Sequence, residues 1–102
     1  MNYIILDFTG IKSLWTLHEH FKTIFNLPEY YGHNMDALWD CLLYSFEFPT
    51  TIVLKNIDSI PAEMAEVVTT MLNLFEDLQR EDKKVTVQIE KGDSEINSSY
   101  II

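Results

Sequence analysis

The chain has little cysteine, little glycine and no long apolar run. It holds one cysteine and three glycines in 102 residues. A single cysteine excludes an internal disulfide, and so few glycines leave no P-loop, dinucleotide fingerprint or nucleophile elbow. No apolar stretch approaches the ~18 residues that span a bilayer. Residues 1–7 lack the basic start and long apolar run of a signal peptide, so we expect a cytoplasmic protein without a membrane partner.

Basic residues are also scarce. Seven Lys and Arg stand against 16 Asp and Glu, which gives a formal net charge of −9. Such a surface repels nucleic acid and attracts basic proteins. No Lys or Arg occurs between Lys22 and Lys55, and none occurs within residues 56–79. The acidic side chains of these two intervals have no cation near them in sequence, which predicts a basic protein as the partner and no direct binding of nucleic acid.

Length and hydrophobic periodicity predict one α/β domain. The hydrophobic fraction of 47% is sufficient for a core. Apolar runs predict two strands, the first of them buried, and an alternation with Val85, Val87 and Ile89 facing inward predicts a third. Helical spacing predicts three helices, and an irregular or short helical turn is also expected. The strands are expected at 3–8, 49–54 and 84–90, the helices at 13–24, 34–45 and 61–80, and the turn at 57–60. This order favours a small three-stranded parallel sheet packed with three to four helices.

The domain is expected to span residues 1–91. From Gly92 the composition turns polar, and the chain then ends in three apolar residues. Residues 92–102 are therefore expected to form an extension, either an added edge strand or a loose tail.

The helix predicted at 34–45 divides into two faces. Asn34 is a suitable N-cap. Helical phasing puts Leu38, Cys41, Leu42 and Ser45 on the core side, with Cys41 as a buried thiol, and Asp36, Asp40, Leu43 and Glu47 on the opposite side. The two aspartates, one turn apart, are either carboxylates presented to a cationic site or an ordinary solvated face. Large apolar residues among them, with no lysine nearby, favour an interface.

The loop before this helix contains Tyr30, Tyr31 and Gly32. Paired tyrosines offer large rigid surfaces for binding, although one buried tyrosine and an ordinary turn glycine would fit equally well. His33 could be imagined as a metal ligand beside Asp36 and Asp40. No Cys or second His accompanies it at ligand spacing, so no metal or cofactor is expected.

The remaining ionisable groups do not predict an enzyme. His18 and His20 are expected at the surface or half-buried. Acid–base catalysis needs two groups in different environments, which two aspartates on one exposed face do not supply. A small metal- or carboxylate-dependent hydrolase is therefore only a third option, after two binding functions.

The stretch LPEYYGHNMDALWDCL, residues 27–42, closely resembles the signature of the barstar family, the intracellular inhibitors of barnase-type ribonucleases. The resemblance extends more weakly over residues 1–90. It implies that the second helix and its preceding loop plug the active site of a basic secreted ribonuclease. Asp40 would enter the phosphate-binding pocket, Asp36 would accept hydrogen bonds beside it, and Tyr30 would pack on the catalytic histidine.

The resemblance also implies which residues surround this contact. They are Tyr31, Gly32, Asn34, Met35 and Trp39, together with Asp77 and Glu81 from the third helix; phasing adds Leu43. Four positions depart from the family pattern: His33, Leu43, Ser45 and Asp77. The departures bear more on which partner is bound than on how it is bound. An immunity protein against a different basic toxin or nuclease is therefore the alternative function.

Overall fold

The computed structural model describes residues 2–90 and 99–101. Strands β1 (Asn2–Asp7), β2 (Thr50–Lys55) and β3 (Val85–Glu90) pair in parallel, in that order. A short strand β4 (Ser99–Ile101) pairs with β3 in the antiparallel direction. The predicted three-stranded parallel sheet is confirmed, and an edge strand is added from the C-terminal extension. Residues 92–98 and 102 of that extension lie outside the described part of the chain.

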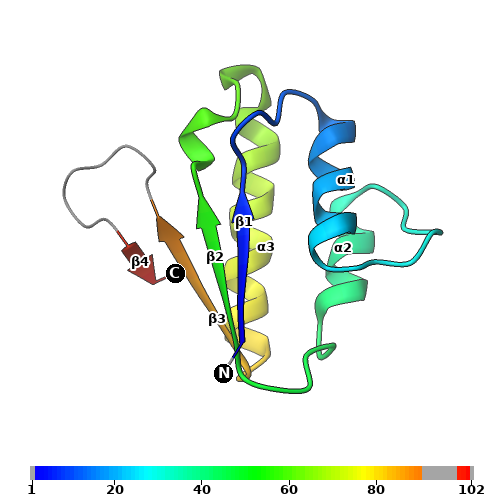
Figure 1. The fold of residues 1–102 in the computed structure, drawn as a ribbon, viewed down its shortest axis with the longest axis vertical. Helices are drawn as coiled ribbons and strands as arrows, with labels where there is room; N and C mark the ends of the chain where they lie inside the picture. Colours follow the sequence, from blue (N-terminus) through cyan, green and yellow to red (C-terminus); the bar gives the residue numbers. More distant parts are fainter. Residues whose placement is uncertain (1, 91–98, 102) are drawn as a thin grey trace.

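Three helices connect these strands. They are α1 (Leu14–Ile24), α2 (Met35–Leu42) and α3 (Ala65–Glu81), and two 3-10 turns, Ile57–Ser59 and Ala62–Met64, precede α3. Because parallel neighbours are joined by right-handed crossovers, the helices fall on one face of the sheet. Figure 1 shows α3 lying behind the parallel strands, with α1 and α2 beside it. Pro61 precedes the second of these 3-10 turns and not, as expected from the sequence, the α-helix. Helix α3 begins at Ala65, four residues later than predicted.

The core lies between the helices and one face of the sheet. Fully buried side chains come from both layers, such as Leu6 and Leu54 from the strands and Phe21, Leu38 and Phe75 from the helices. Val85 and Val87 also point into this core, and Ile89 packs against it, as the alternation of the third strand predicts. Buried side chains of α1, α2 and α3 thus anchor all three helices to the same hydrophobic core.

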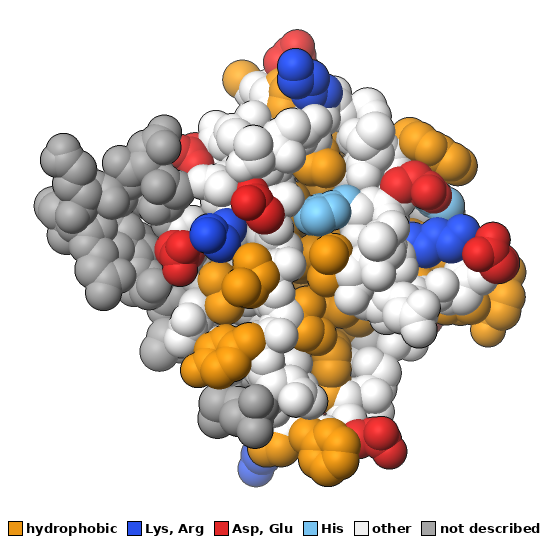
Figure 2. Space-filling model, viewed as in Figure 1, with side chains coloured by type: hydrophobic (Ala, Val, Ile, Leu, Met, Phe, Trp, Pro, Cys, Tyr) orange, Lys and Arg blue, Asp and Glu red, His pale blue; other side chains and the backbone are white. Residues whose placement is uncertain are grey.

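The expectation that the first strand is buried is wrong for one of its faces. Tyr3 is 63% exposed and Ile5 is 52% exposed, whereas Leu6 is fully buried. β1 is an edge strand, and the helices cover only one side of the sheet, so alternate side chains face away from the core. Figure 2 shows hydrophobic side chains gathered over β1 and in the band between β1 and α1. A continuous apolar run does not reveal whether one face or two are covered.

Helix α2 ends at Leu42, three residues earlier than expected. The backbone of Leu43 is already extended, with a φ of −62° and a ψ of 123°, and Tyr44 follows in a left-handed conformation with a φ of 59°. Leu43 is consequently half-buried against the core, not on the presented face. Ser45 is exposed, not part of the core, and its hydroxyl donates to the Leu42 carbonyl at 2.8 Å. Helical phasing ceases to apply once the helix has ended.

Candidate functional site

Helix α2 presents Asp36 and Asp40 to solvent. The side-chain oxygen of its N-cap, Asn34, accepts from the Ala37 amide at 2.8 Å. Leu38 and Leu42 are buried on the opposite side, so the helix is anchored to the core. Both aspartates are exposed, and neither forms an ion pair or a hydrogen bond with any described residue. The arrangement leaves two rigidly held carboxylates that can accept hydrogen bonds or pair with a cation.

The two tyrosines of the loop have opposite environments. Tyr30 is 87% exposed, whereas Tyr31 is 4% exposed. The hydroxyl of Tyr31 forms a hydrogen bond of 2.6 Å with His18 Nδ1, and burial raises the pKa of Tyr31. The expectation that the Tyr31 ring surrounds a partner therefore needs correction, because the ring fills the core beneath the loop. Tyr30 remains as a free aromatic surface.

His18 also lies in the core, contrary to the expectation of a surface or half-buried histidine. It is 1% exposed, and it packs between the rings of Phe21 and Tyr31. Burial lowers the pKa of His18, and the nearby His33 lowers it further. The sequence held a signal for this position, because His18 lies one residue from Leu17 and three from Phe21 on the buried stripe of α1. His20, by contrast, is half-buried as expected.

His33 fastens the loop to α1. Its Nε2 lies 2.5 Å from a carboxylate oxygen of Glu19, and its Nδ1 lies 3.0 Å from the Tyr31 carbonyl. Its ring stacks on that of Trp15, with centroids 4.2 Å apart and planes inclined by 7°. With contacts at both ring nitrogens and at the ring face, the orientation of His33 is fixed. The sequence indicated no role for Trp15 or Glu19, although they stand at i and i+4 on one helix.

The other predicted loop and α2 residues surround the acidic face. Gly32 is exposed, and a Cβ there would come within 3.2 Å of the Asn34 side chain. Met35 and Trp39 are half-buried and pack against the core with part of their surface. Cys41 is half-buried rather than buried, and it lines a cavity of about 500 Å³ between β1, α2 and the loop. The surface around Asp36 and Asp40 thus consists of exposed backbone at Gly32 and partly exposed apolar side chains such as those of Met35 and Trp39.

Helix α3 packs against α2 and carries the last two predicted residues, Asp77 and Glu81. Both are exposed. Asp77 accepts from Arg80 at 3.1 Å, and Arg80 also lies 3.3 Å from Glu76. Such exposed ion pairs contribute about 0–1 kcal/mol, so a partner's cation can compete for Asp77. Glu81 has no ion pair within residues 2–90 and 99–101.

Among the residues that the structure describes, no group of three or more His, Cys, Asp and Glu side chains could hold a metal ion. Nor does any helix in this described part of the chain combine the length and apolar character required to cross a membrane.

The fold and this acidic helix define a small α/β protein built to present carboxylates. The model of the barstar family, described as "Barstar (barnase inhibitor)", matches residues 1–91. Over 83 residues the chain is 35% identical to a protein of Bacillus subtilis (strain 168) named "Putative ribonuclease inhibitor YrdF". That alignment covers 81% of this chain and 91% of the relative. The chain belongs to the barstar family, as the resemblance in residues 27–42 indicates.

Proposed function

We propose that this protein inhibits a barnase-type ribonuclease by inserting α2 and the preceding loop into the basic active site of the enzyme. The observation that carries the proposal is the pair Asp36 and Asp40, exposed, one turn apart and without a cation among the described residues. A ribonuclease site is built to bind a polyanion. A carboxylate on an anchored helix can replace a phosphate there at low cost in conformational entropy.

In this role the protein binds and does not catalyse, and its place of action is the cytoplasm. Asp40 pairs with the arginines and lysine of the phosphate pocket, and Asp36 accepts hydrogen bonds beside it. The exposed ring of Tyr30 packs on the catalytic histidine. Smaller contacts come from Gly32, Asn34, Met35 and Trp39 around the pair, and from Asp77 and Glu81 on α3. Leu43, being half-buried, adds less than its sequence position indicates.

The first experiment measures inhibition of RNA cleavage by a purified barnase-type ribonuclease, with the wild-type protein and Asp40→Ala. Removing one partner of a buried charge pair costs about 2–5 kcal/mol, a figure for which barnase–barstar is itself a reference case. We expect a loss of affinity of that size. Asp58→Ala is the matched control, because Asp58 is an exposed aspartate in the first 3-10 turn.

Two results would contradict the proposal at different levels. No inhibition by micromolar wild-type protein of any such ribonuclease would refute the function itself. An effect of Asp40→Ala below ~1 kcal/mol, equal to that of Asp58→Ala, would make Asp40 a rim residue.

An immunity protein against a different basic toxin or nuclease is the second candidate. The contacts of His33 with Glu19 and Trp15 favour it, because they alter the surface beside the loop at a position that departs from the family pattern. An affinity pull-down from the source cells separates the two candidates. Capture of a basic toxin that binds the α2 surface and has no ribonuclease activity would favour the second candidate.

A further inference from the structure

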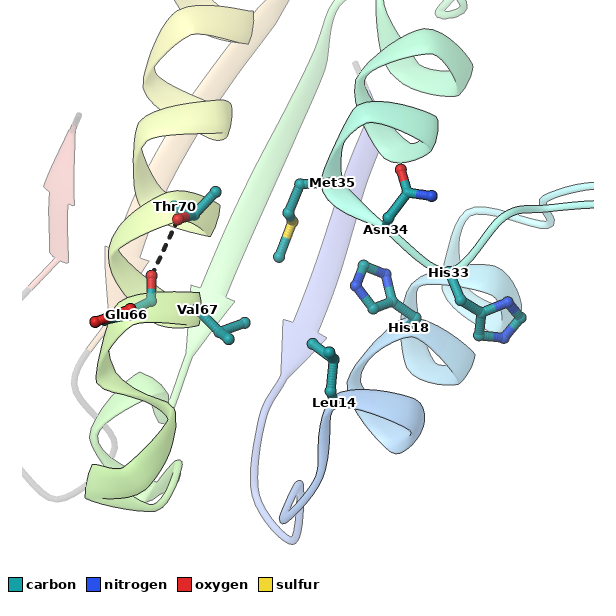
Figure 3. A pocket seen from close by; sticks show the side chains of 8 residues that line it. All are labelled: Leu14, His18, His33, Asn34, Met35, Glu66, Val67 and Thr70. Atoms are coloured by element: carbon teal, nitrogen blue, oxygen red, sulfur yellow. Dashed lines mark hydrogen bonds between the residues drawn. The ribbon is translucent and has the colours of Figure 1, made fainter.

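A groove of about 300 Å³ lies between α1, α3 and the start of α2. Figure 3 shows the side chains of Leu14, Met35 and Val67 converging on this space from three helices, with the ring of His18 at its side. Leu14 is half exposed, and Met35 and Val67 are partly buried. Apolar surface from three elements is therefore in contact with water at one hollow.

The groove is continuous with the surface proposed to meet the ribonuclease. Asn34 and Met35 line it, and both also belong to the proposed contact set around Asp36. Asp36 directly follows Met35 in α2. A protein that binds the two aspartates therefore lies next to the opening of the groove.

The chemistry of the lining selects an uncharged occupant. The carboxylate of Glu66 and the ring of His33, both at the groove, point away from the common space in Figure 3. Both ring nitrogens of His33 are already engaged, by Glu19 and by the Tyr31 carbonyl. Burial lowers the pKa of His18 and so disfavours its charged form. A volume of about 300 Å³ is at the lower end of the range for small-ligand pockets, so it suits one large side chain better than an extended ligand.

We propose that this groove receives one large aromatic or aliphatic side chain that the ribonuclease carries beside its active site. The inference rests on the proposed function and adds an apolar anchor to the acidic one. Interfaces gain much of their affinity from a few side chains that fill such hollows. The groove would then help to decide which basic enzymes are bound, because those without this side chain leave it unfilled.

Two neighbouring threonines of α3 provide a matched test. Thr69 and Thr70 are both exposed, and each donates its hydroxyl to the carbonyl four residues earlier, at 3.1 and 3.0 Å. Thr70 lines the groove and Thr69 does not. Thr70→Trp fills the groove, so we expect at least about tenfold weaker inhibition, the loss that corresponds to one unburied large apolar side chain. Thr69→Trp is expected to stay within about twofold of the wild type.

The outcomes separate this inference from the proposed function. Failure of the wild-type protein to inhibit would refute the function and the inference together. Inhibition by the wild type with equal effects of the two tryptophans would refute the groove alone. Thermal unfolding of each variant verifies that it is folded.

A second measurement needs no variant. In the complex of methyl-labelled wild-type protein with unlabelled ribonuclease, intermolecular NOEs should join the Met35 and Val67 methyl groups to one apolar side chain of the enzyme. Their absence would overturn the inference. NOEs between copies of the free protein would also overturn it, since a second copy would then be the occupant.

Discussion

Two buried or half-buried histidines hold the loop that precedes α2. Beneath it, His18 forms a hydrogen bond of 2.6 Å with the Tyr31 hydroxyl. At its end, His33 contacts Glu19 and stacks on Trp15. His33 keeps this position with a φ of 53°, an uncommon conformation for a residue with a side chain. The loop is thus ordered before any partner arrives, which lowers the entropy lost on binding.

The buried His18 should make stability depend on pH. Its folded pKa lies below the ordinary value of 6.5, so the unfolded chain binds a proton more readily than the folded one. This contribution is complete above pH 6.5, declines as the pH falls below 6.5, and levels off once the folded pKa is passed. Urea unfolding between pH 8 and pH 5 would measure the decline.

His18→Asn is the control for this titration, because its amide can occupy the place of Nδ1 beside the Tyr31 hydroxyl without ionising. The variant is expected to be less stable at pH 8 and to lose less stability between pH 7 and pH 5 than the wild type. Equal slopes in the two proteins would show that other groups set the pH dependence.

At the scale of elements, α1 and α2 begin with side-chain caps. Ser13 accepts from the Thr16 amide at 3.1 Å and completes a capping box, and Asn34 accepts from the Ala37 amide. Helix α2 has only eight residues, and helices that short are marginal without tertiary contacts. The direction of Asp36 and Asp40 therefore depends on the cap and on burial of the opposite helix face.

Replacing the two caps should separate stability from binding. Ser13→Ala and Asn34→Ala are each expected to lower the free energy of unfolding by about 1 kcal/mol, measured by urea denaturation. Asn34→Ala should also weaken ribonuclease inhibition, since the cap fixes the start of the binding helix. Ser13→Ala should leave inhibition unchanged. Equal loss of inhibition in both variants would argue that general destabilisation, not the orientation of α2, is responsible.

At the scale of the whole molecule, the excess of 16 acidic over 7 basic residues sets up a long-range field. Several basic side chains already form ion pairs within the protein. Lys22, Lys55 and Arg80 each have a side-chain nitrogen within 3.5 Å of a carboxylate oxygen. The aspartates of α2 add to this field without a paired cation among the described residues. A basic enzyme should consequently be attracted before contact is made.

This field predicts that association depends on salt. The association rate constant with a basic ribonuclease should fall by about tenfold or more as ionic strength rises from low to high, while dissociation changes little; barnase–barstar is a standard example of such steering. Stopped-flow fluorescence at several salt concentrations would measure both rates. An association rate that does not respond to salt would show that the charge serves solubility alone.

Local patterns predicted the elements well and their surroundings less well. Periodicity of 2 and 3.6 located three strands and three helices, and Asn34 is an N-cap, as predicted. The exposed face of β1 and the early end of α2 were missed, because both depend on what packs nearby. An edge position leaves Tyr3 and Ile5 uncovered, and the extended backbone of Leu43 ends α2 at Leu42.

The α/β order, the acidic surface and the pair of aspartates one helical turn apart follow from composition and short-range spacing, so they can be predicted from the sequence. The burial of Tyr31, the exposure of Tyr30 and the attachment of the loop to α1 become apparent only in the folded protein. Those outcomes depend on contacts across 13 residues, from His18 to Tyr31, and across 14, from Glu19 to His33. Chain positions so far apart meet only when the helices pack on the sheet, and the same packing creates the groove beside Met35.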